Sequence, residues 1–150
     1  MKNKLKVFLQ IFLPIIIGSI VGFIINDYID YNTLNKPPLS PPSWLFPVMW
    51  SIIYLLLGIS YYLFRKNNEN KTTSIIYYTQ LIVNYLWSII FFILKWRFFS
   101  IIWIILLDIL VMLLLYQFFK KEKASVYLNI PYLIWSLFAT YLTTGIYLLN

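Results

Sequence analysis

Five long apolar runs, separated by short polar segments, constrain the fold of this chain more than any other feature. Each run is long enough for a helix to cross the roughly 30 Å of hydrocarbon in a bilayer. A chain in lipid must pair its own backbone N–H and C=O groups, so helices are expected. The sequence therefore predicts an all-α membrane protein, a five-transmembrane-helix bundle forming one domain over residues 1–150. The runs cover residues 7–25, 44–64, 72–94, 98–119 and 124–149.

Composition excludes several kinds of chemistry. The chain has 12 Lys and Arg, 5 Asp and Glu, and neither His nor Cys. It therefore lacks the imidazole and thiolate groups of most zinc sites and of many enzymes, and it has few carboxylates for a hard cation. We expect no metal and no cofactor. The basic residues lie between the apolar runs, where anionic lipid headgroups explain them, so nucleic acid is not an expected partner.

The distribution of Lys and Arg predicts the orientation in the membrane. Nine of them fall at the end of the bundle that holds the N-terminus, and three, Lys36, Lys95 and Arg97, fall at the other. Because basic residues concentrate on the cytoplasmic side, we expect a cytoplasmic-membrane protein with its N-terminus inside and its C-terminus outside. The first run follows three lysines as in a secretory signal, but it is too long and no Ala-x-Ala site follows, which predicts a retained helix.

The loop between the first two runs, residues 26–43, is the only one long enough to have structure of its own. Prolines at 37, 38, 41 and 42 restrict its backbone and predict a stiff lid over the bundle. Ser43 is the predicted N-cap of the second helix, and Pro47 then falls in the first turn. A rigid connector without a ligand role is the alternative interpretation.

Three of the runs carry aromatic, small or amide residues on one helical face. Amides in hydrocarbon need partners, so these faces are predicted to point into the bundle, and Gly58 is expected to admit a neighbouring helix. Hydrogen bonding between helices, without any ligand, is the alternative interpretation. The faces are Trp50, Tyr54, Gly58 and Tyr61; Gln80, Asn84 and Ser88 beside Trp87 and Phe91; and Pro131, Trp135, Ala139 and Thr143.

Asp108 is the only acidic or basic side chain within the runs. A charged Asp at the middle of a span costs about 2.5–3.5 kcal/mol on insertion scales, so it is predicted to face inward. No Lys or Arg shares its depth, which leaves Trp, Tyr, Ser or an amide as its expected partner. Gly18 and Gly22 allow close helix packing, either within the chain, which we expect, or across a homodimer.

The order of these features resembles one known family, the TspO/MBR family of tryptophan-rich sensory and translocator proteins, also called peripheral-type benzodiazepine receptors. The similarity covers nearly the whole chain, and Asp108 also fits it. The residues that carry it are Tyr31, Leu34, Lys36-Pro37, Pro41-Pro42, Trp44, Phe46, Trp50, Tyr54 and Gly58; Gln80-Leu81, Asn84, Trp87 and Phe91-Phe92; and Pro131-Tyr132, Trp135, Phe138-Ala139 and Leu142.

The resemblance implies a pocket, covered by the first loop, for porphyrins and other tetrapyrroles, sterols and isoquinoline-type drugs. It implies a sensor or carrier; light- and oxygen-dependent porphyrin degradation through Trp50 and Trp135, or small-molecule transport, are the alternatives. Tyr147 lacks the following basic residue of the cholesterol motif proposed for animal members, so specific sterol binding is not expected. Thr143 stands where family members commonly have Asn. The implied ligand-binding residues are Tyr31, Phe46, Trp50, Tyr54, Gln80, Asn84, Phe91, Trp135, Ala139 and Thr143.

Overall fold

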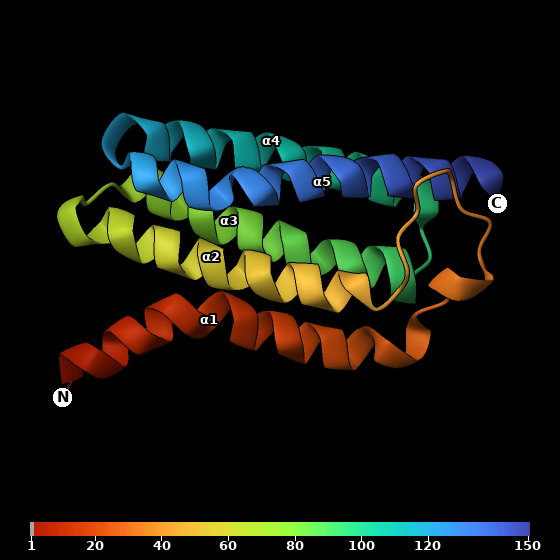
Figure 1. Cartoon of the computed structure of the whole chain (residues 1–150), viewed down its shortest axis with the longest axis horizontal. Helices are drawn as coiled ribbons and strands as arrows, with labels where there is room; N and C mark the ends of the chain where they lie inside the picture. Colours follow the sequence, from red (N-terminus) through yellow and green to blue (C-terminus); the bar gives the residue numbers. More distant parts are fainter. Residues whose placement is uncertain (1) are drawn as a thin grey trace.

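The computed structural model describes residues 2–150 as five long helices that lie side by side and run alternately in opposite directions (Figure 1). All five are long and apolar enough to cross a membrane. The predicted five-helix membrane bundle is therefore confirmed. The helices are α1 (Lys2–Ile25), α2 (Leu45–Asn67), α3 (Lys71–Ser88), α4 (Arg97–Lys121) and α5 (Lys123–Leu149), and a π-helical turn, η3 (Ile89–Ile93), continues α3.

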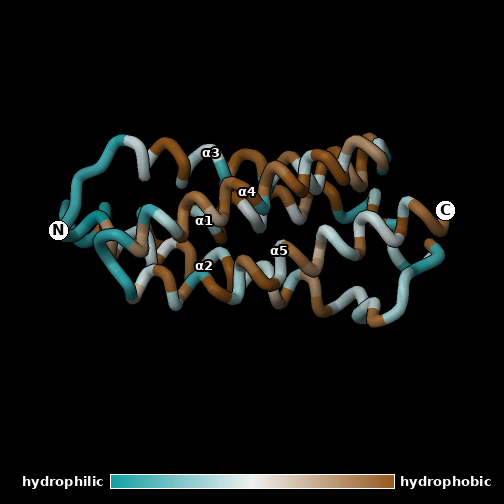
Figure 2. The backbone as a smooth tube through the Cα atoms, turned by 90° about the horizontal axis from the view of Figure 1, so that it is seen from above, coloured by the Kyte–Doolittle hydropathy of each residue, from teal (hydrophilic) through white to brown (hydrophobic). Residues whose placement is uncertain are grey.

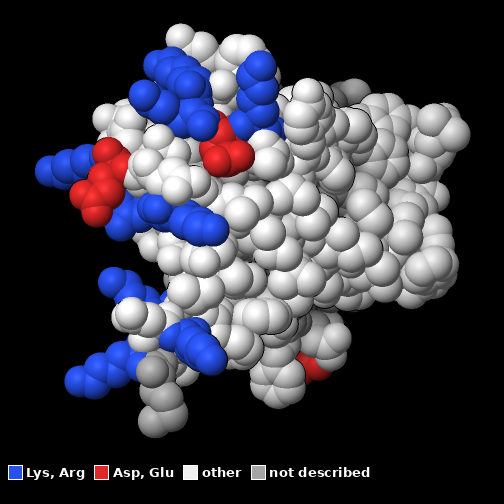
Figure 3. All heavy atoms as spheres, turned by 60° about the vertical axis from the view of Figure 1, so that its left-hand side comes forward, with Lys and Arg blue, Asp and Glu red and all other residues white. Residues whose placement is uncertain are grey.

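The helices extend beyond the apolar runs at their charged ends. α1 begins at Lys2, five residues before its run, and α4 ends at Lys121. An apolar run marks only the part in hydrocarbon, whereas backbone hydrogen bonding continues while lysine side chains reach toward the headgroups. Figure 2 shows hydrophobic backbone between hydrophilic ends, and Figure 3 shows Lys and Arg gathered at one end of the bundle. Which side of the membrane that end faces stays a prediction.

The predicted cap of α2 is wrong. Trp44, not Ser43, is the N-cap, and no side chain caps this end of the helix. The N–H groups of Leu45 and Phe46 instead bond to the carbonyl oxygens of Pro42 and Ser43, at 3.1 and 3.4 Å, which occupies donors that a capping hydroxyl would otherwise serve. Pro47 does lie in the first turn, as predicted.

Two glycines bring α1 close to α2. A Cβ atom added at Gly58 would overlap the backbone of Ile11, whose carbonyl carbon would lie 2.7 Å away. One added at Gly18 would meet the Tyr54 ring, with Cδ2 at 2.6 Å. The expected close approach at Gly58 is confirmed, and Gly18 packs within the chain. A homodimer stays an untested prediction.

Asp108 faces inward, as predicted, and links α4 to α5. It is 5% exposed and accepts hydrogen bonds from the hydroxyls of Ser136 and Thr140, the latter at 2.5 Å. Serine was an expected partner, and threonine was not. Both carboxylate oxygens are thus satisfied within the bundle, as a polar group in hydrocarbon requires.

The first loop is fastened to the end of α5. It contains two short 3₁₀ turns, η1 (Asn26–Tyr28) and η2 (Tyr31–Thr33). Pro37 packs so closely on α5 that a Cβ added at Gly145 would lie 2.7 Å from the Cβ atom of Pro37. Beside it, the Tyr141 hydroxyl donates to the Pro38 carbonyl at 2.7 Å. The loop therefore covers one end of the bundle, next to the C-terminus (Figure 1).

Candidate functional site

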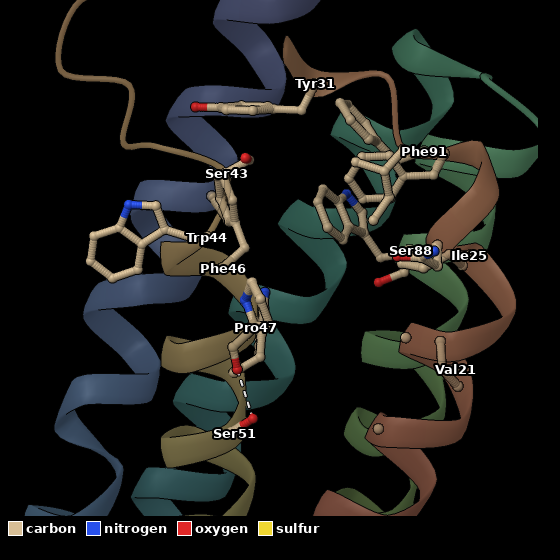
Figure 4. Close-up of a pocket in the computed structure, with 18 of the residues that line it drawn as sticks. Val21, Ile25, Tyr31, Ser43, Trp44, Phe46, Pro47, Ser51, Ser88 and Phe91 are labelled. Atoms are coloured by element: carbon tan, nitrogen blue, oxygen red, sulfur yellow. Dashed lines mark hydrogen bonds between the residues drawn. The ribbon is translucent and has the colours of Figure 1, made fainter.

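A cavity of about 660 Å³ lies beneath the first loop, lined by α1, α2, the end of α3 with η3, and α5. In Figure 4, Tyr31 lies at the loop end of the cavity, Phe46 and Pro47 lie along α2, and Phe91 stands opposite them. Its volume falls within the range of roughly 300–1,000 Å³ that is usual for small-molecule sites. The lining is mainly aromatic and aliphatic, with a few hydroxyl and amide groups.

Seven of the ten implied ligand-binding residues line this cavity, and three lie behind its wall. Those on the surface come from the loop and from three helical segments. Gln80, Asn84 and Trp135 are buried in the helix packing instead, at 0%, 2% and 7% exposure. The seven are Tyr31, Phe46, Trp50, Tyr54, Phe91, Ala139 and Thr143. Whether any of the ten binds a ligand stays a prediction.

Trp50 and Trp135 both face the interior of the bundle from adjoining helices. Trp50 stacks on Tyr54, with ring centroids 5.5 Å apart, and meets Tyr132 of α5 edge-on at 6.3 Å. Trp135 packs against Phe46 at 5.8 Å. In these two groups of aromatic contacts, Trp50 offers its surface to the cavity, while Trp135 supports Phe46 from behind.

A chain of buried hydrogen bonds leads away from the cavity wall into the bundle. The Tyr54 hydroxyl donates to Asn84 Oδ1 at 2.6 Å, and Asn84 Nδ2 donates to the Tyr132 hydroxyl at 2.8 Å. That hydroxyl in turn donates to Gln80 Oε1 at 2.6 Å. The two amides, expected to touch a ligand, here fix the position of Tyr54. This is the interhelical role left open above.

This series of buried hydrogen bonds leads to a stability prediction for two tyrosines. Tyr132→Phe removes an acceptor from Asn84 and a donor from Gln80, whereas Tyr54→Phe removes one donor at the end of the chain. A buried polar group left without its partner costs about 1–3 kcal/mol. We expect thermal unfolding in detergent to show a larger loss for Tyr132→Phe than for Tyr54→Phe, with exposed Tyr116→Phe as the neutral control. Equal melting temperatures for all three variants would contradict a stabilising role for these hydrogen bonds.

The lid end of the cavity is held by polar contacts of the loop. The Tyr31 hydroxyl donates to the Pro41 carbonyl at 2.7 Å, and burial raises the pKa of this phenol above its ordinary value. The Lys36 ammonium donates to the carbonyls of Tyr31 and Leu34, both at 3.1 Å. These contacts close the loop on itself and hold the Tyr31 ring against Phe46, at a centroid distance of 5.0 Å.

One wall of the cavity was missed by sequence reasoning. α1 contributes a row of small and aliphatic side chains, among them Ile15, Val21 and Ile25, with Gly18 and Gly22. Nothing lies within 4 Å of a Cβ atom added at Gly22, which therefore borders open space. The Gly-x-x-x-Gly spacing was the available signal, but we interpreted it only as a packing motif.

The lining carries no Lys, Arg, Asp or Glu among the residues that the structure describes. Its exposed members lie partly in the first loop and partly along the facing sides of α1 and α2, where they include Ser19, Gly22, Pro47 and Ser51. The mouth of the cavity is therefore a gap between two membrane helices as well as the space under the loop. Such a site suits an uncharged, flat, apolar guest that partitions into the bilayer.

Comparison with known proteins agrees with this architecture. The sequence profile of the TspO/MBR family matches residues 10–149. The chain is 42% identical over 123 residues to the tryptophan-rich protein TspO of Archaeoglobus fulgidus, covering 80% of this chain and 79% of that protein. It is 35% identical over 124 residues to the protein of the same name from Chlorobaculum tepidum, covering 80% and 78%. The sheep translocator protein shares 33% identity over 67 residues, 41% of this chain and 40% of that one.

Fold and site together define an integral membrane protein, a bundle of five spanning helices around a loop-covered, aromatic-lined cavity. With a profile match over almost the whole chain and relatives at up to 42% identity, the chain belongs to the TspO/MBR family. The resemblance noted in the sequence is thereby confirmed.

Proposed function

We propose that this protein binds porphyrins and related tetrapyrroles, and isoquinoline-type drugs, in its cavity, and that it acts as a sensor or carrier for them. The observation that carries the proposal is the uncharged, aromatic-lined cavity of about 660 Å³ under the first loop. A flat macrocycle would stack on Trp50 and contact Phe46 and Phe91. Each offset-stacked aromatic pair contributes about 0.5–1.5 kcal/mol beyond burial of its area.

The absence of charge from the described lining sets the orientation of such a guest. Ionised propionates would find no cation on the wall, and burying an unpaired carboxylate is unfavourable. They would therefore point to the exposed loop end of the cavity, where Asn26 and Asn32 lie. The apolar edge of the macrocycle would face the interior.

Fluorescence quenching by protoporphyrin IX tests the binding proposal. We expect Trp50→Ala to weaken affinity by about tenfold, which corresponds to the loss of one stacking partner with its area. Trp135→Ala should have a smaller effect because that ring lies behind the wall, and Trp96→Ala, which is outside the cavity, should have none. The dimethyl ester should bind at least as well as the free acid. Unchanged affinity in a Trp50→Ala/Trp135→Ala double variant would refute the site.

Light- and oxygen-dependent porphyrin degradation is the second candidate, favoured by the stacking of Trp50 on Tyr54 at 5.5 Å. Dioxygen would be the oxidant, and the excited porphyrin would be oxidised. Trp50 and Trp135 would relay electrons from the porphyrin to dioxygen. Under equal illumination, protoporphyrin absorbance should bleach several-fold faster with the wild type than with Trp50→Phe, which keeps an aromatic surface. Equal rates with both proteins, at matched occupancy, would exclude the relay.

Two further proposals concern the orientation of the protein in its membrane and whether it transports its ligand. The nine Lys and Arg at the N-terminal end against three at the other favour a cytoplasmic-membrane protein with its N-terminus inside and C-terminus outside. Transport of a small molecule, by this chain or by a homodimer of it, remains the alternative to sensing. Uptake of protoporphyrin into proteoliposomes distinguishes the two.

A further inference from the structure

A second hollow lies outside the cavity, at the end of the bundle where α4 begins and α5 ends. Its volume is about 370 Å³, and it is open on one side. We call it the α4–α5 groove. It brings together the lid segment, the short link between η3 and α4, and the last turn of α5. Its lining is Leu34, Lys95, Arg97, Phe98, Ile146, Tyr147 and Asn150.

The side-chain charges in the groove do not balance. Arg97 Nη2 contacts both carboxylate oxygens of Asp30, at 3.0 and 2.9 Å, and Lys95 Nζ lies 3.5 Å from the same carboxylate. One carboxylate thus faces two cations. The Lys95 side chain is 55% exposed, against 15% for Arg97, so Lys95 is the cation that faces the open side.

The backbone holds Lys95 in place at a conformational cost. Its φ of 58° lies in the left-handed region, which residues other than Gly, Asn and Asp rarely adopt. Hydrogen bonds on either side stabilise this turn, from Leu94 N–H to the Ile89 carbonyl at 3.0 Å and from Trp96 N–H to the Ile90 carbonyl at 3.2 Å. A left-handed residue directly after a helix end is the common way to close that end, so this turn fixes the position of Lys95 without itself indicating a ligand.

The rest of the groove is apolar and aromatic. Phe98 packs against Tyr147 with ring centroids 5.5 Å apart, and Leu34 and Ile146 complete the wall. The groove lies at the ends of two spanning helices, where hydrocarbon gives way to headgroups and where Tyr and Trp rings settle. A free anion would contact only the cations, whereas an amphiphile with a negative head would contact both the cations and the apolar wall.

We propose that the α4–α5 groove binds one phospholipid with a net negative headgroup. Its phosphate contacts Lys95, and its glycerol and upper acyl carbons lie on Phe98, Tyr147 and Ile146. Ile146 also lines the main cavity, so the lipid rests against the outer side of a shared wall. Leu34 belongs to the lid, so a bound lipid also contacts the loop that covers the cavity.

Native mass spectrometry of the detergent-purified full chain tests the groove, with phosphatidylglycerol and phosphatidylcholine as probes. One Lys near an anionic surface contributes enough for roughly a five-fold change in affinity. Asparagine tolerates the left-handed conformation, so Lys95→Asn should keep the turn intact. We expect this variant to bind about five-fold less phosphatidylglycerol and the same amount of phosphatidylcholine. Lys121→Asn, at the opposite end of the bundle, is the matched control and should bind like the wild type. Asp30→Asn, which removes the competing carboxylate, should increase phosphatidylglycerol binding.

Three results would overturn the proposal. Equal phosphatidylglycerol binding by wild type and Lys95→Asn would show that the groove is not the site. An equal loss with Lys121→Asn would indicate general charge attraction. Displacement of the lipid by millimolar inorganic phosphate or glycerol phosphate would indicate a site for free anions rather than for a lipid. Each comparison uses variants with matched melting temperatures, so a folding defect is recognised before binding is measured.

Discussion

Replacing Gly58 with alanine should destabilise the bundle more than the same replacement at any of the other three glycines. The new Cβ would overlap the backbone of Ile11, which, unlike the end of a flexible side chain, cannot move aside. α1 and α2 would have to separate along their contact. Overpacking of this kind costs about 1–3 kcal/mol. We expect a clear fall in the melting temperature in detergent, together with loss of cavity binding, because α1 forms one wall.

Gly22→Ala is the matched control for this experiment. It lies on the same pair of facing helices, yet an added Cβ there meets nothing within 4 Å. Alanine is favoured over glycine in a helix by about 1 kcal/mol, so this variant should be as stable as the wild type or more so. If Gly58→Ala and Gly22→Ala melt at the same temperature, the close contact between α1 and α2 is contradicted.

Filling the cavity should weaken ligand binding strongly without unfolding the protein. Gly22→Phe places a ring in the open space beside α1, and Ala139→Leu adds three carbons to the opposite wall on α5. We expect each variant to lose more than tenfold in affinity for protoporphyrin IX, because each new side chain would occupy space in the cavity that the macrocycle would otherwise fill. Quenching titrations measure this effect.

The two cavity-filling variants differ in whether the new side chain can avoid the cavity, so each serves as a control for the other. A phenylalanine at position 22 has a route outward into lipid, whereas Ala139 is 5% exposed and has none. Gly22→Ala, which changes little of the volume, should bind like the wild type. Wild-type affinity in both filled variants, with melting temperatures unchanged, would show that porphyrins bind elsewhere on the protein.

Much of the fold could be predicted from hydropathy because lipid imposes a simple rule on the backbone. Every span in the sequence became a helix, and the inward direction of Asp108 followed from the cost of a carboxylate in hydrocarbon. The ends of the helices could not be predicted from hydropathy as well as their middles. Lys2 and Lys121 lie in helices that continue past the apolar runs, and the Asn70 side chain caps α3 by accepting from the Thr73 N–H at 3.2 Å, a cap we did not anticipate.

The sequence predicted which side chains of the candidate site point into the bundle, but not which of them reach the cavity surface. Helical periodicity indicated that Gln80, Asn84 and Trp135 point into the bundle, as they do. It could not distinguish a residue on the cavity surface from one a layer behind, because that depends on how far neighbouring helices approach. The α1 wall was missed for a related reason: Ile, Val and Gly in a membrane helix look the same whether they face lipid, protein or an empty space.

The position of α1 has a consequence for how this architecture accommodates different molecules. This helix packs chiefly on α2 and α3, while α4 and α5 are joined to each other elsewhere through Asp108. We expect thicker or thinner guests to be accommodated by a small tilt of α1 about its close contact at Gly58, while the remaining four helices keep their arrangement. Substitutions along α1 should therefore alter which molecules fit, with little effect on how the rest of the chain assembles.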